Sequence, residues 1–308
     1  MMKKHIYFPS SEGKTKLHGV IWEPETQPKA IVQIVHGMVE YVERYEIFAK
    51  FLNEHGILVA GHDHLGHGSS YMEEWQKGYF AKEKGDICAI QDMHRMTVLL
   101  QRKYPDIPHF IFGHSMGSFL TRRYLCMYPN EVDGAIISGT GWKPVPVLKG
   151  GLGVVKLLSV LKGDKFRSIF VTKLAFGSIN KAFEPVKTSK DWISRDVEVC
   201  RKYVDDPNCG FLFTLNGYHV LFRSMLMAQN AELMQRMDED LPVLFIAGEM
   251  DPVGDFGKGV KKTVNAFYES GMYDVECILY PEARHELTNE VNKAEVFQDI
   301  LEWIEFRI

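Results

Sequence analysis

The feature that constrains the fold most is residues 110–118, where an apolar strand pattern runs directly into a helix pattern. Between the two patterns lies G-x-S-x-G, formed by Gly113, Ser115 and Gly117. A strand that turns at once into a helix leaves no room for side chains two residues before and after the corner, so glycine fills both places. The corner residue is held in a strained conformation with its hydroxyl at the edge of the sheet. The helix start adds unpaired N–H groups, so the segment predicts a nucleophilic serine with half of an oxyanion site.

Composition limits the classes of protein that this chain can belong to. Its 308 residues are 45% hydrophobic, enough for one large core with an insertion or for two domains. A formal charge of −4 without a basic stripe argues against a nucleic-acid partner. The five cysteines are scattered without C-x-x-C pairs, which favours reduced thiols over a disulfide framework. We see no signal peptide pattern and no apolar stretch of membrane-spanning length, and therefore expect a cytoplasmic protein of unknown oligomeric state.

Strand and helix patterns alternate along most of the chain. Short apolar runs on either side of residues 10–14 predict a β-hairpin at the start. Further strands are predicted at 30–35, 57–60, 109–112, 134–138, 242–247 and 275–280, and helices at about 45–55, 86–104, 119–127, 223–237, 258–269 and 291–306. This alternation predicts an α/β fold with a mostly parallel, doubly wound sheet and helices on both faces.

The alternation stops between residues 142 and 222. That segment is rich in apolar and aromatic side chains, and we expect a helical cap inserted between two core segments, 1–141 and 223–308. A cap has to cover the mouth of the site, so some of its apolar side chains should line it. The candidates are Leu152, Val155, Leu158, Leu161 and Phe166. Residues 152–161 are also a candidate for transient contact with a membrane or micelle, although ordinary packing explains them equally well.

A serine hydroxyl needs a base, and the base needs an acid that orients it. Loops at the carboxyl ends of parallel strands converge, so both partners should follow later strands. Asp251 follows the strand 242–247, and His285 follows the strand 275–280, which gives the chain order Ser115, Asp251, His285. Glu249 and Asp255 are rival acids in the same loop.

The second oxyanion donor should come from the loop after strand 30–35, which reads His-Gly-Met-Val-Glu over residues 36–40. Gly37 lets the backbone turn. The N–H of Met38 can then join the N–H of Met116 around a developing oxyanion.

Residues 61–69 contain His62, Asp63, His64 and His67, a density that also occurs in metal sites. The run follows a strand, its glycines suit a tight loop, and no second cluster supplies further ligands. We therefore interpret it as a loop and expect no metal or other cofactor.

Several short motifs together resemble one known family. They are His36-Gly37-x-x-Glu40-x-x-x-Arg44-Tyr45, Asp63-x-x-Gly66-His67-Gly68-x-Ser70, Gly113-His114-Ser115-Met116-Gly117, Gly248-x-x-Asp251-Pro252 and His285. Spread over nearly the whole predicted core, they are similar to those of α/β-hydrolases of the monoacylglycerol lipase and lysophospholipase group, which is also classified with serine aminopeptidases. The cap segments 191–196 and 206–211 resemble bacterial members.

The resemblance implies an α/β-hydrolase fold, selects Asp251 as the acid, and makes a small-molecule acyl ester or lysolipid the expected substrate. The cap would form the acyl pocket, and Glu40 and Arg44 would lie near the alcohol end. The substrate-binding residues expected on this basis are His36, Gly37, Glu40, Arg44 and His114. The chain departs from the pattern on the alcohol side, where Val39 replaces a frequent glycine and Tyr41 a frequent histidine.

We therefore expect a serine hydrolase that cleaves carboxylic esters with an apolar acyl chain through an acyl-enzyme. A thioesterase and an aminopeptidase of the same fold remain alternatives, and an acidic cluster in the cap would favour the aminopeptidase. A ligand receptor of this fold without useful turnover is the alternative from another class.

Overall fold

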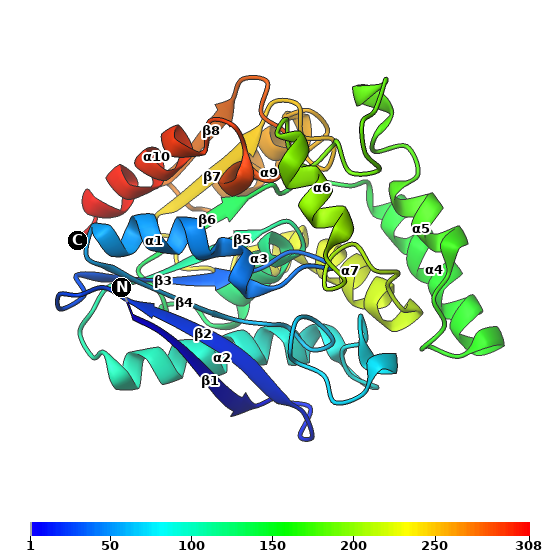
Figure 1. The fold of residues 1–308 in the computed structure, drawn as a ribbon, viewed down its shortest axis with the longest axis horizontal. Helices are drawn as coiled ribbons and strands as arrows, with labels where there is room; N and C mark the ends of the chain where they lie inside the picture. Colours follow the sequence, from blue (N-terminus) through cyan, green and yellow to red (C-terminus); the bar gives the residue numbers. More distant parts are fainter. Residues whose placement is uncertain (1) are drawn as a thin grey trace.

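One sheet organises the structure, a computed structural model that describes residues 2–308. Within these residues eight strands pair in the order β1-β2-β4-β3-β5-β6-β7-β8 (Figure 1). The strands are β1 (Met2–Pro9), β2 (Lys16–Glu23), β3 (Ala30–Val35), β4 (Ile57–His62), β5 (His109–His114), β6 (Gly134–Ser138), β7 (Val243–Gly248) and β8 (Val275–Tyr280). Only the pairings β1–β2 and β2–β4 are antiparallel; the remaining pairs of this sheet are parallel. The α/β class and the mostly parallel sheet are confirmed.

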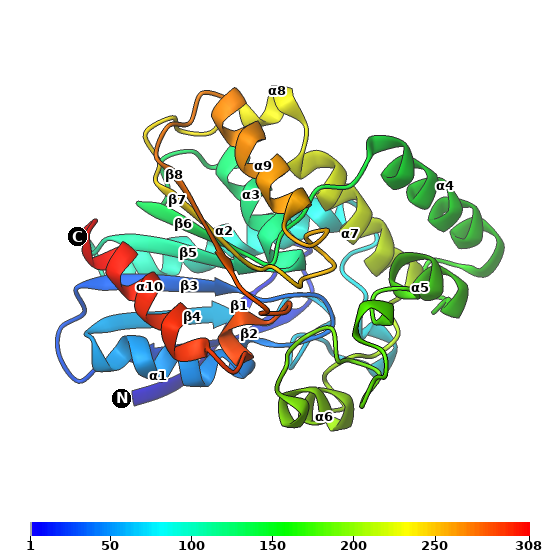
Figure 2. The same cartoon turned by 90° about the horizontal axis from the view of Figure 1, so that it is seen from above.

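Helices cover both faces of the sheet, because its central strands are apolar on both sides (Figure 2). On one face, α1 (Glu46–Glu54) and α10 (Lys293–Glu305) bury Phe48 and Ile300 against the strands. The other face is covered by α2 (Gly85–Lys103), α3 (Met116–Met127) and α9 (Lys258–Glu269). These helices agree with the predicted ones to within three residues at each end.

The segment after β6 lies beyond the carboxyl ends of the parallel strands (Figures 1 and 2). It contains α4 (Val145–Lys162), α5 (Ile169–Phe176), α6 (Val197–Asp205) and the first half of α7 (Leu215–Ala228). The sheet therefore carries its connecting loops and this helical segment at the same edge.

The helix predicted at 223–237 is wrong in its bounds. The helix α7 begins eight residues earlier, because the side chain of Thr214 caps it by accepting a hydrogen bond from Gly217 N–H. It ends at Ala228, and Asn230 caps a separate short helix, α8 (Ala231–Met234). The expected cap boundary at residue 222 consequently falls inside α7.

Among residues 2–308, no helix combines the length and the apolar character that crossing a bilayer requires.

The corner between β5 and α3 depends on a close contact. A Cβ at Gly117 would lie 2.0 Å from the carbonyl oxygen of Val35 in β3, far inside the contact distance of real side chains. We expect Gly117→Ala to lower the free energy of unfolding by at least about 3 kcal/mol, since backbone atoms cannot move aside cheaply. Urea denaturation measures the change.

Gly153 provides the matched control. It is an exposed residue of α4 whose Cβ would meet no atom within 4 Å. Gly153→Ala should raise the free energy of unfolding by about 0.5–1 kcal/mol, because alanine favours the helix. Equal effects of the two substitutions would contradict the contact at Gly117.

Candidate active site

Ser115 occupies the strained corner that the glycine spacing predicts. Its backbone has φ 53° and ψ −118°, in the region that residues with a side chain rarely adopt. A Cβ at Gly113 would lie 2.3 Å from Thr121 Oγ1, so both glycines are required by close packing. Ser115 is held further by its N–H, which donates to the Ser138 carbonyl of β6 at 3.0 Å.

Two side chains from distant loops meet the Ser115 hydroxyl. His285 Nε2 lies 2.9 Å from Ser115 Oγ, and His285 Nδ1 lies 2.8 Å from Asp251 Oδ2. The other carboxylate oxygen of Asp251 accepts a hydrogen bond from Val253 N–H. The rival acid Asp255 is exposed, and so is Glu249, whereas Asp251 is fully buried. The structure thus brings the three predicted residues into one hydrogen-bonded chain.

The surroundings of His285 raise the pKa of its imidazole. Burial alone would lower the pKa of His285, but the Asp251 carboxylate outweighs burial, and the pKa is raised above its usual value. The neighbouring ring of His114, 4.7 Å away, is buried, and burial lowers its pKa well below the usual value. His114 is therefore neutral beside His285 at pH 7.

The predicted oxyanion loop lies against the serine. The Cβ position of Gly37 is 3.1 Å from Ser115 Cβ, and Met38 and Met116 both line the cavity above the serine. In the described part of the chain, no hydrogen bond uses the N–H of Met38. Met116 is the first residue of α3, where N–H groups have no partner within the helix. Both N–H groups are thus available to an oxyanion.

A cluster of buried charges holds this loop from behind. Arg44 NH1 and NH2 donate to the two carboxylate oxygens of Glu286 at 2.8 and 2.7 Å, and NH1 also donates to Glu40. Glu40 in turn accepts from the N–H of Gly37 and from the hydroxyl of Tyr45. The cluster therefore connects the residue after His285 with the residue before Met38.

The cluster pairs Glu40 with Arg44, both expected near the alcohol end of the substrate, and adds a residue that sequence reasoning missed, Glu286. Its position directly after the predicted base was the available signal. Burial opposes the ionisation of Glu286, but Arg44 holds its pKa below the usual value. Burial raises the pKa of Glu40 despite Arg44.

A cavity of about 950 Å³ opens above Ser115 between the core and the helical segment. Its wall is predominantly apolar, with α4, α5 and α7 contributing Leu148, Phe176 and Met225. The charged side chains among its described lining residues are all basic: Lys143, Lys173 and Lys190. The arrangement offers an apolar compartment next to a nucleophile, with no carboxylate in the lining.

Two sets of predicted substrate contacts are absent from this lining. The first set comes from the cap: Leu152, Val155, Leu158, Leu161 and Phe166. Val155 is buried inside the protein and Leu161 is 65% exposed, because α4 turns its first two turns rather than its middle toward the cavity. The second set lies behind the oxyanion loop: His36, Gly37, Glu40, Arg44 and His114. These residues support the loops that carry the site.

The histidine-rich loop after β4 is packed into the core. Asp63 accepts hydrogen bonds from His18, Val42 N–H and Ser69 N–H. His36 Nε2 accepts from the N–H of His64, which ties this loop to the oxyanion loop. Burial lowers the pKa of His36 to about 3, and of His62 and His67 to about 4, so these rings are neutral.

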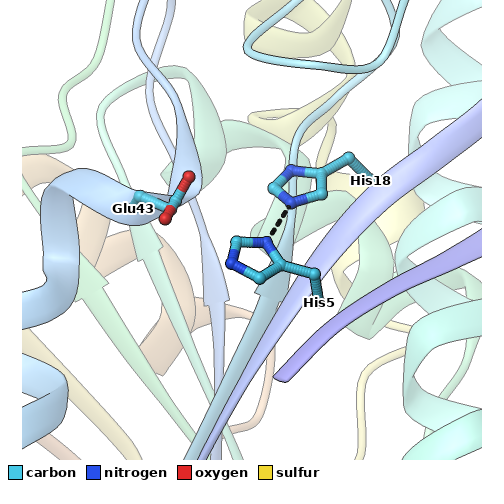
Figure 3. Close-up of side chains that lie close together, drawn as sticks. All are labelled: His5, His18 and Glu43. Carbon is cyan, nitrogen blue, oxygen red and sulfur yellow. Dashed lines mark hydrogen bonds between the residues drawn. The ribbon is translucent and has the colours of Figure 1, made fainter. Parts of the chain in front are cut away.

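Within residues 2–308, potential metal ligands converge at a different place: His5 and His18 on the β1–β2 hairpin, and Glu43 in the turn between β3 and α1 (Figure 3). It lies apart from the cavity lining.

The sequence profile described as "Serine aminopeptidase, S33" matches residues 26–292. The chain belongs to this family. It is a hydrolase of the α/β-hydrolase fold.

Similar proteins align with nearly the whole chain. A monoglyceride lipase homolog of monkeypox virus is 27% identical over 291 residues, 93% of each chain. A monoacylglycerol lipase of Mycolicibacterium smegmatis is 26% identical and covers 92% of this chain and 91% of its own. A thermostable carboxyl esterase from Bacillus coagulans, solved with glycerol, superposes with a TM-score of 0.92 at 30% identity, covering 100% and 99% of the two chains.

Val39, which stands where many members of the family have glycine, has a strained backbone. Its φ of 52° lies in the left-handed region, which strongly disfavours a β-branched side chain and explains the frequent glycine there. The Val39 carbonyl accepts hydrogen bonds from Gly210 N–H and the Tyr203 hydroxyl, both from the cap segment. These contacts hold the strained residue next to Met38.

The raised pKa of His285 predicts a pH dependence. The base must be neutral to take the serine proton, so kcat/KM should fall as the pH drops through the pKa of His285, with a midpoint above about 6.5, the ordinary value of histidine. In Asp251→Asn the midpoint should move to lower pH, because the charge that raises the pKa is gone. Activity should also drop on the order of 10⁴-fold. Asp255→Asn is the control and should leave the profile unchanged; the reverse ranking would make Asp255 the acid.

The charge cluster predicts a stability effect without a change in specificity. Glu40→Gln removes a buried carboxylate from Arg44 and should lower the free energy of unfolding by about 2–3 kcal/mol. The preference between glyceryl and simple alkyl esters should stay constant, because Glu40 lies outside the cavity lining.

Glu46→Gln is the control, since Glu46 forms a partly exposed ion pair with Lys3 near the surface and should contribute less than about 1 kcal/mol. Chemical denaturation and competition between the two esters measure both properties. An altered ester preference at constant stability would place Glu40 in contact with the alcohol.

Proposed function

We propose that this hydrolase cleaves carboxylic esters with an apolar acyl chain through an acyl-enzyme at Ser115. The observation that carries the proposal is the hydrogen-bonded chain Ser115–His285–Asp251 at the base of a large apolar cavity. Relatives named as monoglyceride lipases and a carboxyl esterase support an ester as the substrate. Residues 142–222 would act as the cap that encloses the acyl chain.

In the proposed reaction, His285 Nε2 takes the hydroxyl proton while Ser115 Oγ attacks the ester carbonyl. The N–H groups of Met38 and Met116 stabilise the oxyanion. His285 then gives its proton to the leaving alcohol and later takes a proton from the water that releases the acid. Asp251 stabilises the cationic imidazole in the orientation that both steps need.

The cavity argues against the aminopeptidase alternative. A peptide substrate presents an N-terminal ammonium group, which an enzyme binds with a carboxylate. The charged groups among the described lining residues are instead Lys143, Lys173 and Lys190, which would repel an ammonium group. An uncharged ester avoids this repulsion, and so does a thioester.

The outer surface of the cap supports contact with lipid aggregates. Val160 is 78% exposed on α4, and Phe170 is 62% exposed on α5. Exposed apolar side chains of neighbouring helices are typical of surfaces that rest on membranes or micelles. We propose that the cap docks there while the cavity takes up a monomeric substrate.

Acyl chain length tests the proposed substrate class. From acetyl through butyryl to octanoyl p-nitrophenyl esters, kcat/KM should rise and then level off, because each buried methylene contributes about 0.8 kcal/mol, or about fourfold. Leu174→Trp, which fills the cavity, should reduce octanoyl turnover and spare acetyl turnover. The exposed Leu157 lies outside the lining, so Leu157→Trp is the matched control.

A falling profile beyond acetyl would reject the acyl pocket and indicate a small-ester esterase. Ser115→Ala should abolish both turnover and covalent labelling by a fluorophosphonate. Labelling that survives Ser115→Ala would reject the assigned nucleophile, and labelling without turnover of any ester would indicate a receptor.

A further inference from the structure

Two histidines and a glutamate converge at the edge of the sheet remote from the cavity. His5 belongs to β1, His18 to β2, and Glu43 to η1 (Val42–Tyr45), the turn that precedes α1. Figure 3 shows the two imidazole rings facing each other with the carboxylate beside them. His5 Nδ1 lies 2.8 Å from His18 Nε2, and one ligand atom from each residue lies within 4.8 Å of the others.

A single buried carboxylate orients two of the three residues. Asp63 Oδ2 lies 2.8 Å from His18 Nδ1, so His18 donates there and turns the lone pair of Nε2 toward His5. Asp63 Oδ1 accepts from the N–H of Val42, the first residue of the turn that carries Glu43. A carboxylate behind a ligating histidine is the usual support of metal-binding imidazoles.

The local charge also favours a cation. Asp63, Glu43 and Glu46 provide three carboxylates, and Lys3 is the cation paired with two of them. The three carboxylates outnumber Lys3, and a divalent cation would offset this surplus of acidic groups.

We propose that His5, His18 and Glu43 form a binding site for a divalent transition-metal ion, with Zn²⁺ as the best match. Two imidazole nitrogens and a carboxylate are a set that zinc uses in proteins, and a fourth position would remain for water because His5 is exposed. Bonds of about 2.0–2.2 Å in a tetrahedron separate ligand atoms by about 3.3–3.5 Å. The two imidazole nitrogens, 2.8 Å apart, would have to separate slightly, and the carboxylate of Glu43 lies within 4.8 Å of both rings, so modest side-chain shifts complete the site.

Binding of the metal would move a proton on His5 and break the ion pair between Lys3 and Glu43. On binding, the proton between His5 Nδ1 and His18 Nε2 moves through solvent to Nε2 of His5, a change of tautomer that frees the Nδ1 lone pair, and one lone pair from each ring then binds the metal. Glu43 exchanges Lys3 for the metal, while Lys3 keeps Glu46 at 3.2 Å. Lys3 is therefore a built-in competitor whose removal should strengthen binding.

Titration of the EDTA-treated, full-length protein with Zn²⁺ alone tests the site. Calorimetry measures the stoichiometry and affinity, and thermal unfolding measures the change in Tm. We expect one Zn²⁺ per chain and a rise in Tm with zinc concentration. His5→Gln should weaken binding by more than about 100-fold, since even outer-shell partners contribute 10–100-fold. Lys3→Met should tighten binding several-fold, and His219→Gln, at another exposed histidine, should leave it unchanged.

The two opposite effects separate this site from adventitious zinc. Absence of stoichiometric binding would overturn the proposal, and so would binding that His5→Gln leaves unchanged, because the metal would then sit elsewhere. His5 is an exposed side chain of an edge strand, so its replacement should fold. Ester hydrolysis by the His5→Gln variant should equal that of the unsubstituted protein, which keeps this test independent of the proposed function.

Discussion

The contact of Gly117 with the end of β3 is the constraint on which the active-site geometry depends. Because no side chain intervenes, the first turn of α3 lies directly against the carbonyl groups of Val35 and His36. That approach brings Met116 next to the loop that carries Met38. The strained backbone of Ser115 is the cost of this arrangement, and the packing of the sheet on both faces maintains it.

The buried ion pairs of Arg44 align two loops from opposite ends of the chain, the one with Gly37 and Glu40 and the one with His285 and Glu286. Taking Glu40 and Glu286 out of water is unfavourable, and the bidentate geometry of Arg44 offsets that cost. A hydrophobic cluster could hold the loops equally tightly, but it lacks the direction of hydrogen bonds. Here Glu40 accepts a hydrogen bond from the N–H of Gly37. This bond orients the His36–Gly37 peptide, which directly precedes the peptide that carries the Met38 N–H.

The expectations that agree with the arrangement in the structure rest on glycine spacing and on where strands end. Glycine spacing marked the corner at Ser115, and strand ends marked Asp251 and His285, because a parallel sheet brings such ends together. The helix α7 was misplaced since apolar residues 211–222 suit a cap as well as a helix start, and only the capping side chain of Thr214 separates the two. The cavity lining was missed because it depends on which turns of α4 lie over the cavity, and helical periodicity does not determine that.

Val39 connects the loop of residues 36–40 with the helical segment after β6. A glycine would adopt its left-handed conformation without strain, so the valine needs support from elsewhere. That support comes from Gly210 and Tyr203, whose hydrogen bonds hold the Val39 carbonyl from the cap side. The ring of Tyr203 also lies 4.8 Å from the guanidinium of Arg44. The helical segment after β6 is therefore coupled to residues 36–40 by hydrogen bonds to the Val39 carbonyl, so joint displacement of α6 and the loop that carries Gly210 would release the strained residue beside Met38.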